Sequence, residues 1–447
     1  MRARWIALLA TVVIVGAASA ACRDDSDETS SDSGPTDAAS CDFNPPDEEF
    51  PAVDQPGVTD TEINVGAIVA AENPINVPFD ATVDGTEAYF CKINQEGGVY
   101  GRELKLVSVR DDRGNGSVSV EQARALIEED NVFAVLPVAT IGFPAGANEY
   151  LGESGVPTFG FNLTGWNDYP NLFGERGSFL CAECPILAPS YVAEQIEAER
   201  VAILAYSVGE SSDCANGVQL AMEHYGFETP IFDTAVQFGF QPQDITNTIN
   251  DIRDQEVDLV VTCMDVNGTA TFAQAIDQAG LDDVAVFASQ GYDQRALDSF
   301  GDVLDNFYFS PPFWPFELAD ENEEMTEFVE YMDARGAVVS ELEFAGWSSA
   351  ALFVEGLLGA GPEFTRQSVI DAINQMEDWD AHGTRDVIDW TISHTDVREE
   401  ACGSYVKVEN GEFVPVFGEP GKPFVCLPFG LTVDELAPTL DDPVYKP

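Results

Sequence analysis

The chain has 447 residues, of which 20 are Lys or Arg and 79 are Asp or Glu, so its formal net charge at pH 7 is −59. A surface with this excess of negative charge repels nucleic acid and anionic lipid, and we exclude both as partners. Hydrophobic residues make up 45% of the chain. This proportion supports the cores of two or three globular domains.

The N-terminus has the pattern of an export signal. Arg2 and Arg4 precede an apolar run from Trp5 to Val15, and small residues then lead to Cys22. The apolar run is too short for a permanent membrane-spanning helix. Residues 1–21 are therefore predicted to be a signal peptide, and the protein is expected to act outside the cytoplasm.

The segment from Ser19 to Cys22 resembles a bacterial lipobox, in which the cysteine is lipidated and becomes the first residue of the mature protein. A lipobox usually has an aliphatic residue three positions before the cysteine, where this chain has Ser19. The resemblance implies a lipoprotein that meets the cell membrane only through its lipid anchor at Cys22. The alternative is ordinary cleavage after the alanine-rich stretch, which leaves Cys22 free.

A polar segment follows the signal. The chain from Arg23 to Ser40 is rich in Asp, Ser, Thr and Glu. A segment of this composition buries too little apolar surface to form a core. Residues 22–56 are therefore predicted to be an acidic, flexible linker between the anchor and the globular part of the protein.

Residues 58–113 have the pattern of a strand, a helix and a second strand. The apolar run Ile63–Val69 has strand length and lacks polar alternation, as in a parallel strand covered on both faces. The next positions are spaced alternately four and three residues apart, which places them on one face of a helix, and Gly97 and Gly98 end that helix. The positions on this face are Phe79, Val83, Thr86, Phe90 and Ile93. With a strand at Leu104–Val109, this order predicts a right-handed βαβ unit whose ligand position lies at the carboxyl ends of the strands.

The alternation of strands and helices continues to residue 287. The predicted helices are 118–129, 145–151, one whose end is 193–198, then 214–225, 245–253 and 270–279. The predicted strands are 132–136, 156–161, 201–205, 230–236, 257–262 and 284–287. Two βα series of this length predict an α/β fold with two Rossmann-like lobes, each built on a parallel sheet. The cleft between two such lobes is a default ligand position.

The last third of the chain departs from this alternation. A strand at 307–309 is followed by three predicted helices at 324–334, 343–358 and 366–376. Residues 405–408 and 413–416 are predicted to pair as a hairpin, because Asn410-Gly411 between them favours a tight turn.

Three segments of the opening unit carry a family resemblance. They are TDTEINVG at 59–66, INQEGGVYGR at 93–102 and RDD at 110–112. Together they resemble the opening of the leucine/isoleucine/valine-binding family, the type I substrate-binding proteins of ABC importers. Residues 344–351 resemble the long C-terminal helix of that family, so the resemblance extends from Val58 to about Leu427.

The resemblance implies a type I periplasmic-binding-protein fold, in which the chain crosses between its lobes three times. Lobe 1 is then expected to comprise residues 57–180 and 313–395. Lobe 2 is expected to comprise residues 181–312 and 396–440. The three crossing segments form the hinge.

Eight cysteines follow Cys22, an even number in a chain expected to reach an oxidising compartment. Eight cysteines allow 105 connectivities. The pairing we expect is Cys41–Cys91, Cys181–Cys184, Cys214–Cys263 and Cys402–Cys426. The last pair brackets a predicted hairpin, and the third lies at one end of neighbouring βα units.

Cys181-Ala-Glu-Cys184 has the spacing of a redox or zinc motif. A redox motif belongs at the first helix of a thioredoxin-like unit, and zinc requires a second ligand pair at matching spacing. The sequence has neither feature, so we interpret this pair as a structural disulfide. No metal site and no cofactor are expected.

The sequence contains no recognisable catalytic constellation. Its three histidines, His224, His382 and His394, have no companion nucleophile at a familiar spacing, and the chain lacks GxSxG, HExxH and P-loop motifs. Gly346-Trp347-Ser348-Ser349 lies within a helical pattern and is interpreted as packing. The protein is therefore not expected to be an enzyme.

The resemblance implies ligand-binding positions in lobe 1, where the family holds a ligand carboxylate through backbone N–H and hydroxyl groups. Thr164 falls on the ligand-binding threonine of the family, with Asn162 and Trp166 in the same loop. Ile141 takes roughly the place of a family serine, so Thr140 is the expected donor in that loop.

Lobe 2 of the family supplies an aromatic residue and an acid that pairs with the ligand ammonium. Tyr206 lies near the position of a family aromatic residue, Asp265 falls where an aromatic residue is common, and Gln290 falls where amino-acid binders carry the acid. A neutral amide at Gln290 forfeits a charge-assisted bond to an ammonium group, although Asp265 can restore it from another direction. Amino acids, amides, short-chain acids and aromatic compounds are therefore competing ligands.

Six aromatic residues surround Pro311-Pro312 at an expected lobe crossing. One interpretation is packing of the hinge and core. The other is that Phe313 or Trp314 lines the pocket and favours an apolar or aromatic ligand.

These features predict an exported, lipid-anchored and monomeric solute-binding protein that closes over a small polar or amphipathic ligand and presents it to an ABC transporter permease. A second interpretation is a ligand sensor, in which the same two-lobed body presents its closed form to a signalling partner. An exported hydrolase is a distant third.

The charge composition predicts adaptation to salt, because only five of the twenty basic residues are Lys while acidic residues number 79. We expect the thermal unfolding temperature to fall when NaCl is removed, since salt screens the repulsion among the carboxylates. Thermal unfolding measured against NaCl concentration checks this. A temperature that stays constant from low to high NaCl contradicts it.

Overall fold

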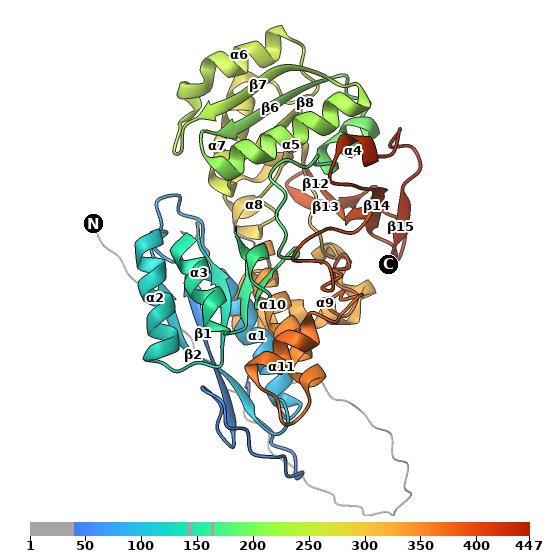
Figure 1. The fold of residues 1–447 in the computed structure, drawn as a ribbon. Coiled ribbons are helices and arrows are strands. Elements are labelled where there is room, and N and C mark those ends of the chain that lie inside the picture. The colour runs from blue at the N-terminus through green and yellow to red at the C-terminus, as the bar shows by residue number, and fades with distance from the viewer. Residues whose placement is uncertain (1–39, 142–144, 162–164) are drawn as a thin grey trace, which may run out of the picture. The chain divides into compact units, whose positions relative to one another are not determined.

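The computed structural model describes residues 40–141, 145–161 and 165–447 (Figure 1). The predicted signal peptide, Cys22 and the linker as far as residue 39 lie outside the described residues. Within the described ranges, no helix combines the length and the apolar character needed to cross a membrane.

Lobe 1 is built on a five-stranded parallel sheet with strand order β2-β1-β3-β4-β5. Its strands are β1 (Glu62–Val69), β2 (Glu103–Asp111), β3 (Ala134–Ala139), β4 (Thr158–Gly160) and β5 (Leu172–Gly174). The central strand β3 is buried along its whole length. The edge strand β2 leaves Val107 and Val109 exposed, as expected for a strand covered on fewer sides.

Six helices accompany the lobe 1 sheet. They are α1 (Ala81–Gln95), α2 (Gly116–Glu128), α3 (Ala145–Ser154), α9 (Glu323–Arg335), α10 (Glu341–Ala360) and α11 (Arg366–Ile373). α1 and α10 contact each other and β3, while α2 contacts α3 and the strands β1 and β2 (Figure 1). The C-terminal helices therefore return to the sheet that the N-terminal residues begin.

Lobe 2 is built on a seven-stranded sheet with strand order β13-β12-β10-β9-β8-β6-β7. Its strands are β6 (Arg200–Tyr206), β7 (Glu228–Val236), β8 (Leu259–Cys263), β9 (Ala285–Ala288), β10 (Phe307–Phe309), β12 (Tyr405–Glu409) and β13 (Glu412–Val416). Its helices are α4 (Ala188–Gln195), α5 (Gly209–Tyr225), α6 (Thr246–Asp254), α7 (Val266–Ala279) and α8 (Gln294–Phe300). The predicted C-terminal hairpin is the antiparallel pair β12 and β13.

A third, three-stranded antiparallel sheet was not predicted. It has the order β11-β14-β15 and consists of β11 (Glu400–Gly403), β14 (Phe424–Pro428) and β15 (Val444–Lys446). Its strands have only three to five residues each, so their sequences lack a readable period. β5 and α8 were missed for the same reason, because they have only three and seven residues.

All four expected disulfides are present in the structure. They are Cys41–Cys91, Cys181–Cys184, Cys214–Cys263 and Cys402–Cys426. The last pair joins directly opposed residues of β11 and β14. It therefore holds together the small sheet that the sequence patterns did not reveal.

The chain between residues 41 and 56 is fixed to lobe 1, although it falls within the predicted linker. The Cys41–Cys91 disulfide ties it to α1, and Arg102 donates from Nη2 to the Pro51 carbonyl at 2.7 Å. Phe50 also packs on the ring of Tyr100 with centroids 5.7 Å apart. The predicted linker therefore does not extend to residue 56, because its described part, residues 41–56, is held against lobe 1. The lobe boundaries remain predictions.

The close crossing of α1 and α10 depends on two glycines. A Cβ atom on Gly85 of α1 would lie 1.7 Å from the Glu343 carbonyl oxygen, and one on Gly346 of α10 would lie 1.9 Å from the Thr82 carbonyl oxygen. Thr86 Oγ1, fully buried, donates to the Gly346 carbonyl across the crossing at 3.1 Å. Gly346-Trp347-Ser348-Ser349 is therefore a packing segment, as interpreted from the sequence.

We expect Gly346→Ala to lower the free energy of unfolding by about 3 kcal/mol, because the new methyl group meets main-chain atoms that have little room to move. Urea unfolding at constant NaCl measures this. The matched control is Gly209→Ala in the first turn of α5, where no atom lies within 4 Å of the new Cβ. Equal stability of the two variants would contradict the proposed role of the crossing.

Candidate functional site

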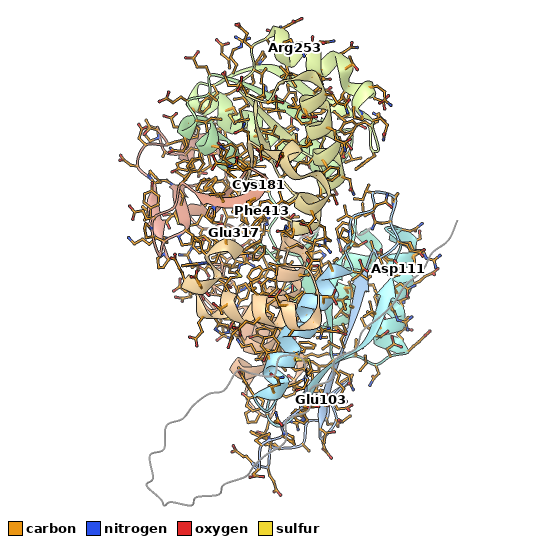
Figure 2. All side chains as sticks on the ribbon, turned by 180° about the vertical axis from the view of Figure 1, so that it is seen from behind. Glu103, Asp111, Cys181, Arg253, Glu317 and Phe413 are labelled. Carbon is orange, nitrogen blue, oxygen red and sulfur yellow. A yellow bond between two sulfur atoms is a disulfide. The ribbon has the colours of Figure 1, made fainter. Side chains whose placement is uncertain are left out.

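The carboxyl end of the lobe 1 sheet is organised around a buried carboxylate. Asp111, labelled in Figure 2, ends β2. The next residue, Asp112, is fully buried. It accepts hydrogen bonds from Thr140 Oγ1 at 2.6 Å and from Gly114 N at 2.8 Å. Thr140, predicted as a ligand donor, therefore gives its only hydroxyl proton to Asp112. Its neighbour Ile141 is half-buried beside Gly114.

The second predicted loop of lobe 1 is described only in part. Asn162 and Thr164 lie outside the described residues. Trp166 is fully buried in a cluster that includes Leu151 and Leu172, and its Nε1 donates to Asn148 Oδ1 at 3.2 Å. The indole thus anchors the far end of this loop in the interior of lobe 1.

The carboxyl end of the lobe 2 sheet brings Tyr206 and Asp265 together. The Tyr206 hydroxyl, at the end of β6, donates to Asp265 Oδ2 at 2.8 Å. Burial, followed by the negative charge of Asp265, raises the pKa of Tyr206, so the phenol stays protonated and acts as a donor. Gly268 makes this arrangement sterically feasible, because a Cβ there would lie 1.9 Å from the Tyr206 hydroxyl oxygen.

Asp265 also caps the N-terminus of α7. Its Oδ1 accepts from Asn267 N at 2.8 Å and from Gly268 N at 3.2 Å. The carboxylate therefore already has three donors before any ligand is considered. The ring of Tyr206 stacks on Phe238 with centroids 4.1 Å apart, and Phe238 remains 44% exposed. This face of lobe 2 thus combines one engaged carboxylate with an accessible aromatic surface.

Gln290 follows β9 and is exposed. The next residue, Gly291, donates its N–H to Glu341 Oε1 at 3.1 Å. Glu341 is the first residue of α10 and was not predicted as a site residue. A sequence signal was available, because Ser340 and Glu343 have the spacing of a helix-capping pair and Ser340 does cap α10. This capping pair predicts a helix that begins at Glu341 and not at Glu343.

The pKa of Glu341 is raised to about 7, chiefly because the carboxyl group is desolvated. The Gly291 N–H and the positive charge of Arg176 act in the opposite direction and favour the ionised form. A neutral carboxyl group at this position is therefore accessible near physiological pH.

The loops at the carboxyl ends of the two sheets contact each other. Asn267 Nδ2 of lobe 2 donates to the Ile75 carbonyl of lobe 1 at 2.7 Å. Val266 packs against the apolar cluster formed around Val77, Ala81 and Leu342. The first turn of α7, directly after Asp265, therefore meets lobe 1, which is the arrangement a ligand held between lobes requires.

Trp314 lies in the interior of the crossover region. It is 3% exposed, its Nε1 donates to the Leu318 carbonyl at 2.8 Å, and its ring meets Phe424 edge-on. Phe313 packs on Phe344 of α10 with centroids 4.6 Å apart. These contacts correspond to the packing interpretation of the aromatic cluster.

Comparison with known proteins agrees with this architecture. Residues 62–412 match the family described as periplasmic binding protein. The chain belongs to the periplasmic binding protein family. Its fold is the type I fold of that family, with α/β lobes on parallel-strand sheets, so the resemblance and the fold class predicted from the sequence are both confirmed.

Several solved structures are similar to this periplasmic binding protein. A fatty acid ABC transporter substrate-binding protein from Thermomonospora curvata has a TM-score of 0.65 at 16% identity, covering 81% of this chain and 94% of the other. A solute-binding protein from R. palustris in complex with benzoate has a TM-score of 0.63 at 16% identity, covering 79% and 95%. The protein LivJ from Streptococcus pneumoniae in complex with isoleucine has a TM-score of 0.62 at 16% identity, covering 80% and 99%.

A curated relative matches a shorter stretch of this periplasmic binding protein. It is Leu/Ile/Val-binding protein homolog 7 from Brucella suis, which is 30% identical over 98 residues. The match covers 22% of this chain and 24% of the relative, so the chain spans about a quarter of the length of that protein in the alignment.

We expect Glu341→Gln to stabilise the protein at pH 8 by roughly 2–3 kcal/mol, because ionising Glu341 in the folded state requires a pH near 7. A raised folded-state pKa favours the folded protein below the unfolded value near 4.5, and this benefit is lost as the pH rises through about 7. The difference between variant and wild type should therefore vanish below pH 4.5.

Urea unfolding at pH 4 and pH 8 in constant NaCl measures both effects. Glu363→Gln, at an exposed position in the loop before α11, is the matched control and should change little at either pH. Destabilisation by Glu341→Gln at both pH values would contradict the prediction and would mean that the folded protein needs the charge.

Proposed function

We propose that the protein is an extracytoplasmic solute-binding protein that delivers a small polar or amphipathic ligand to an ABC importer by closing its lobes. The observation that carries the proposal is the family match over residues 62–412, on a type I fold whose carboxyl-end loops meet between lobes. A ligand that contacts both sets of loops stabilises the closed form, and the permease recognises that form. The protein binds its ligand and does not convert it.

We propose that Tyr206, Asp265 and Gln290 face the ligand from lobe 2, and that Thr164 and Asn162 are the ligand-binding residues of lobe 1. Gln290 offers a neutral amide where amino-acid binders carry an acid. The Asp265 carboxylate already accepts from Tyr206, Asn267 N and Gly268 N, so a ligand ammonium has to compete with these donors. This arrangement favours ligands without an α-ammonium group.

The aromatic surface of Tyr206 and Phe238 adds a preference for an apolar or aromatic ligand body. Similar structures are named for a fatty acid transporter and for complexes with benzoate and isoleucine, so the fold accommodates this range. Among branched-chain amino acids, amides and carboxylates, we therefore propose an aromatic or aliphatic carboxylate as the ligand.

We also propose that the exported chain is a monomeric lipoprotein anchored through Cys22. An acidic tether from Arg23 to Ser40 would then hold the two lobes away from the membrane, whose anionic lipids repel a chain of this charge. The permease partner follows from the importer function.

A thermal-shift screen at high NaCl with amino acids, amides, aliphatic carboxylates and aromatic acids tests the ligand class. We expect a carboxylate to stabilise the protein most, with a gain of about 2.7 kcal/mol when its concentration is 100 times its Kd. A branched-chain amino acid as the best ligand would show that the emphasis on Gln290 is wrong.

Two controls belong to the screen. Thr164→Ala is expected to weaken binding of the best ligand about tenfold, which corresponds to the loss of one hydrogen bond to a charged group. Thr439→Ala, at an exposed position near the C-terminus, should leave the affinity unchanged. Recovery of the ligand in altered form after incubation would contradict a binding function.

A further inference from the structure

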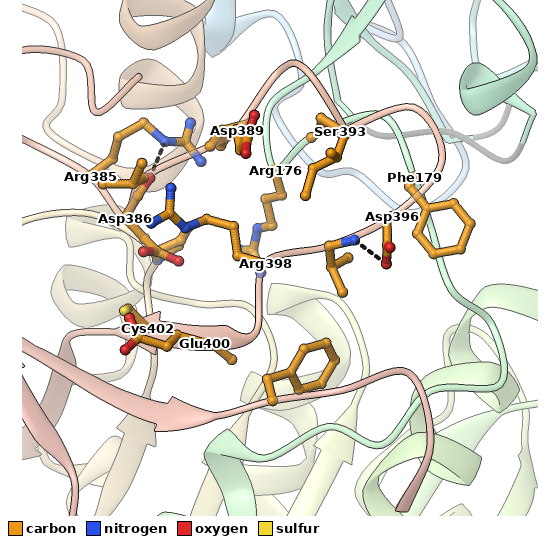
Figure 3. Close-up of a pocket in the computed structure, with 18 residues that line it drawn as sticks. Arg176, Phe179, Arg385, Asp386, Asp389, Ser393, Asp396, Arg398, Glu400 and Cys402 are labelled. Carbon is orange, nitrogen blue, oxygen red and sulfur yellow. Dashed lines mark hydrogen bonds between the residues drawn. The ribbon is translucent and has the colours of Figure 1, made fainter. Parts of the chain in front are cut away.

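A separate cavity lies where the three segments that connect the lobes run together (Figure 3). Its volume is about 250 Å³. Arg176 and Phe179 of the first connection line it, together with Pro312 of the second and residues 385–402 of the third. None of the residues predicted to bind the transported ligand is among those that line this cavity.

Three arginines contribute to the wall of this cavity. Figure 3 shows Arg176, Arg385 and Arg398 extending toward one another from the first and third connections. The chain has only 20 basic residues against 79 acidic ones, so most of its cations are expected to find carboxylate partners. Arg176, however, is exposed and makes no hydrogen bond or ion pair with any described residue.

Arg385 brings a buried positive charge to the same place. Its residue is 4% exposed, and its guanidinium lies over the ring of Trp379 at 5.2 Å and donates to Ser348 Oγ at 3.1 Å. It forms no ion pair within the described residues. Burial lowers the pKa of Arg385 to about 10, which leaves it charged at neutral pH. No described carboxylate lies within ion-pair distance of this buried cation, and the charges of Glu175 and Asp386 only partly offset its desolvation, so an anion close to it would add to the stabilisation.

The carboxylates that line the cavity have other partners. Asp389 accepts from Thr391 N at 3.0 Å and from Thr391 Oγ1 at 2.6 Å. Asp396 accepts from Val397 N at 2.9 Å, and Glu400 pairs with Lys446. Each of these three groups is therefore occupied within its own loop or sheet.

Asp386 and Arg398 complete the wall. The positive charges of Arg385 and Arg398 favour the ionised form of Asp386, whose carboxylate also accepts backbone N–H bonds from Cys402 and Val387. Arg398 pairs with Asp378, whose side chain is 79% exposed, at 3.2 Å. An ion pair this exposed contributes little stability, which leaves the Arg398 guanidinium available to a better-placed anion.

We propose that this cavity binds a small anion of the carboxylate or oxoanion class. The planar N–H forks of Arg176 and Arg398 match the paired oxygens of such an anion, and Arg385 supplies a third positive charge at its buried end. The anion would connect the first and third connections between the lobes. Since hinge motion changes the spacing of these segments, binding of the anion is coupled to lobe closure. This proposal does not depend on the identity of the transported ligand.

Titration of the full-length chain with sodium formate and with sodium sulfate, each replacing NaCl at constant sodium concentration, tests the site. We expect a saturable rise in the thermal unfolding temperature with at least one of these anions. Saturation with formate alone identifies a carboxylate site, and saturation with sulfate alone identifies an inorganic oxoanion site. Saturation with both identifies a site that accepts either.

Substitutions of the cavity arginines show whether the rise in thermal unfolding temperature comes from this site. Arg176→Gln and Arg398→Gln should each weaken the apparent affinity at least about tenfold, because each removes a charged fork from the anion. Arg113→Gln is the control, since Arg113 does not line the cavity, its side chain is 70% exposed and its only ion pairs within the described residues are at 4.0 Å. Its response should equal that of the wild type.

Three outcomes would overturn the proposal. One is a wild-type response that never saturates, which reports only the general effect of salt on stability. Another is an unchanged affinity in Arg398→Gln, since an anion bound between the lobes near Arg176 and Glu341 would not sense Arg398. The last is an equal loss of affinity in Arg113→Gln.

Discussion

The direct approach of the α1 and α10 backbones is the constraint on which the rest of the structure depends. Gly85 and Gly346 allow the two helices to meet without side chains between them, and Tyr89 and Trp347 then pack edge to face at 4.9 Å. α1 comes from the N-terminal part of the sequence and α10 from its last third. Their crossing therefore joins the two parts of lobe 1, between which the chain passes through lobe 2. It also sets the position of the N-terminus of α10, and hence of the Glu341 carboxylate that meets Gly291 of lobe 2.

Two of the few basic residues, Lys92 and Arg102, are placed where they organise the fold. Lys92 is paired with Glu324, which also accepts from the Trp347 indole at 2.9 Å, so one buried ion pair fastens α9 to the α1 and α10 crossing. Arg102 serves main-chain carbonyls instead of carboxylates and donates to Thr59 O and Pro51 O. In a chain of net charge −59, the surface supplies negative charge in excess, while Lys92 and Arg102 are buried, where removing either would leave its buried partners without a donor.

The elements that depend on local periodicity and composition were predictable from the sequence. The buried run of β1, the α1 stop at Gly97 and the Asn410-Gly411 hairpin are local patterns, and each is present in the structure. Hydrogen bonds between residues far apart in the sequence were not predictable. The hydrogen bond from Thr140 to Asp112 spans 28 residues and that from Tyr206 to Asp265 spans 59, so no local pattern indicates that these side chains already have partners.

The disulfide between Cys41 and Cys91 changes how lobe 1 is loaded mechanically. Cys91 lies within α1, beside the buried Phe90 and Lys92, and not at an edge of the sheet. A pull on the N-terminal segment therefore reaches the centre of the helical layer through a covalent bond and bypasses the hydrogen bonds of residues 44–56. Lobe 1 resists such a force as one body, and peeling from its first strand is prevented while the bond is intact.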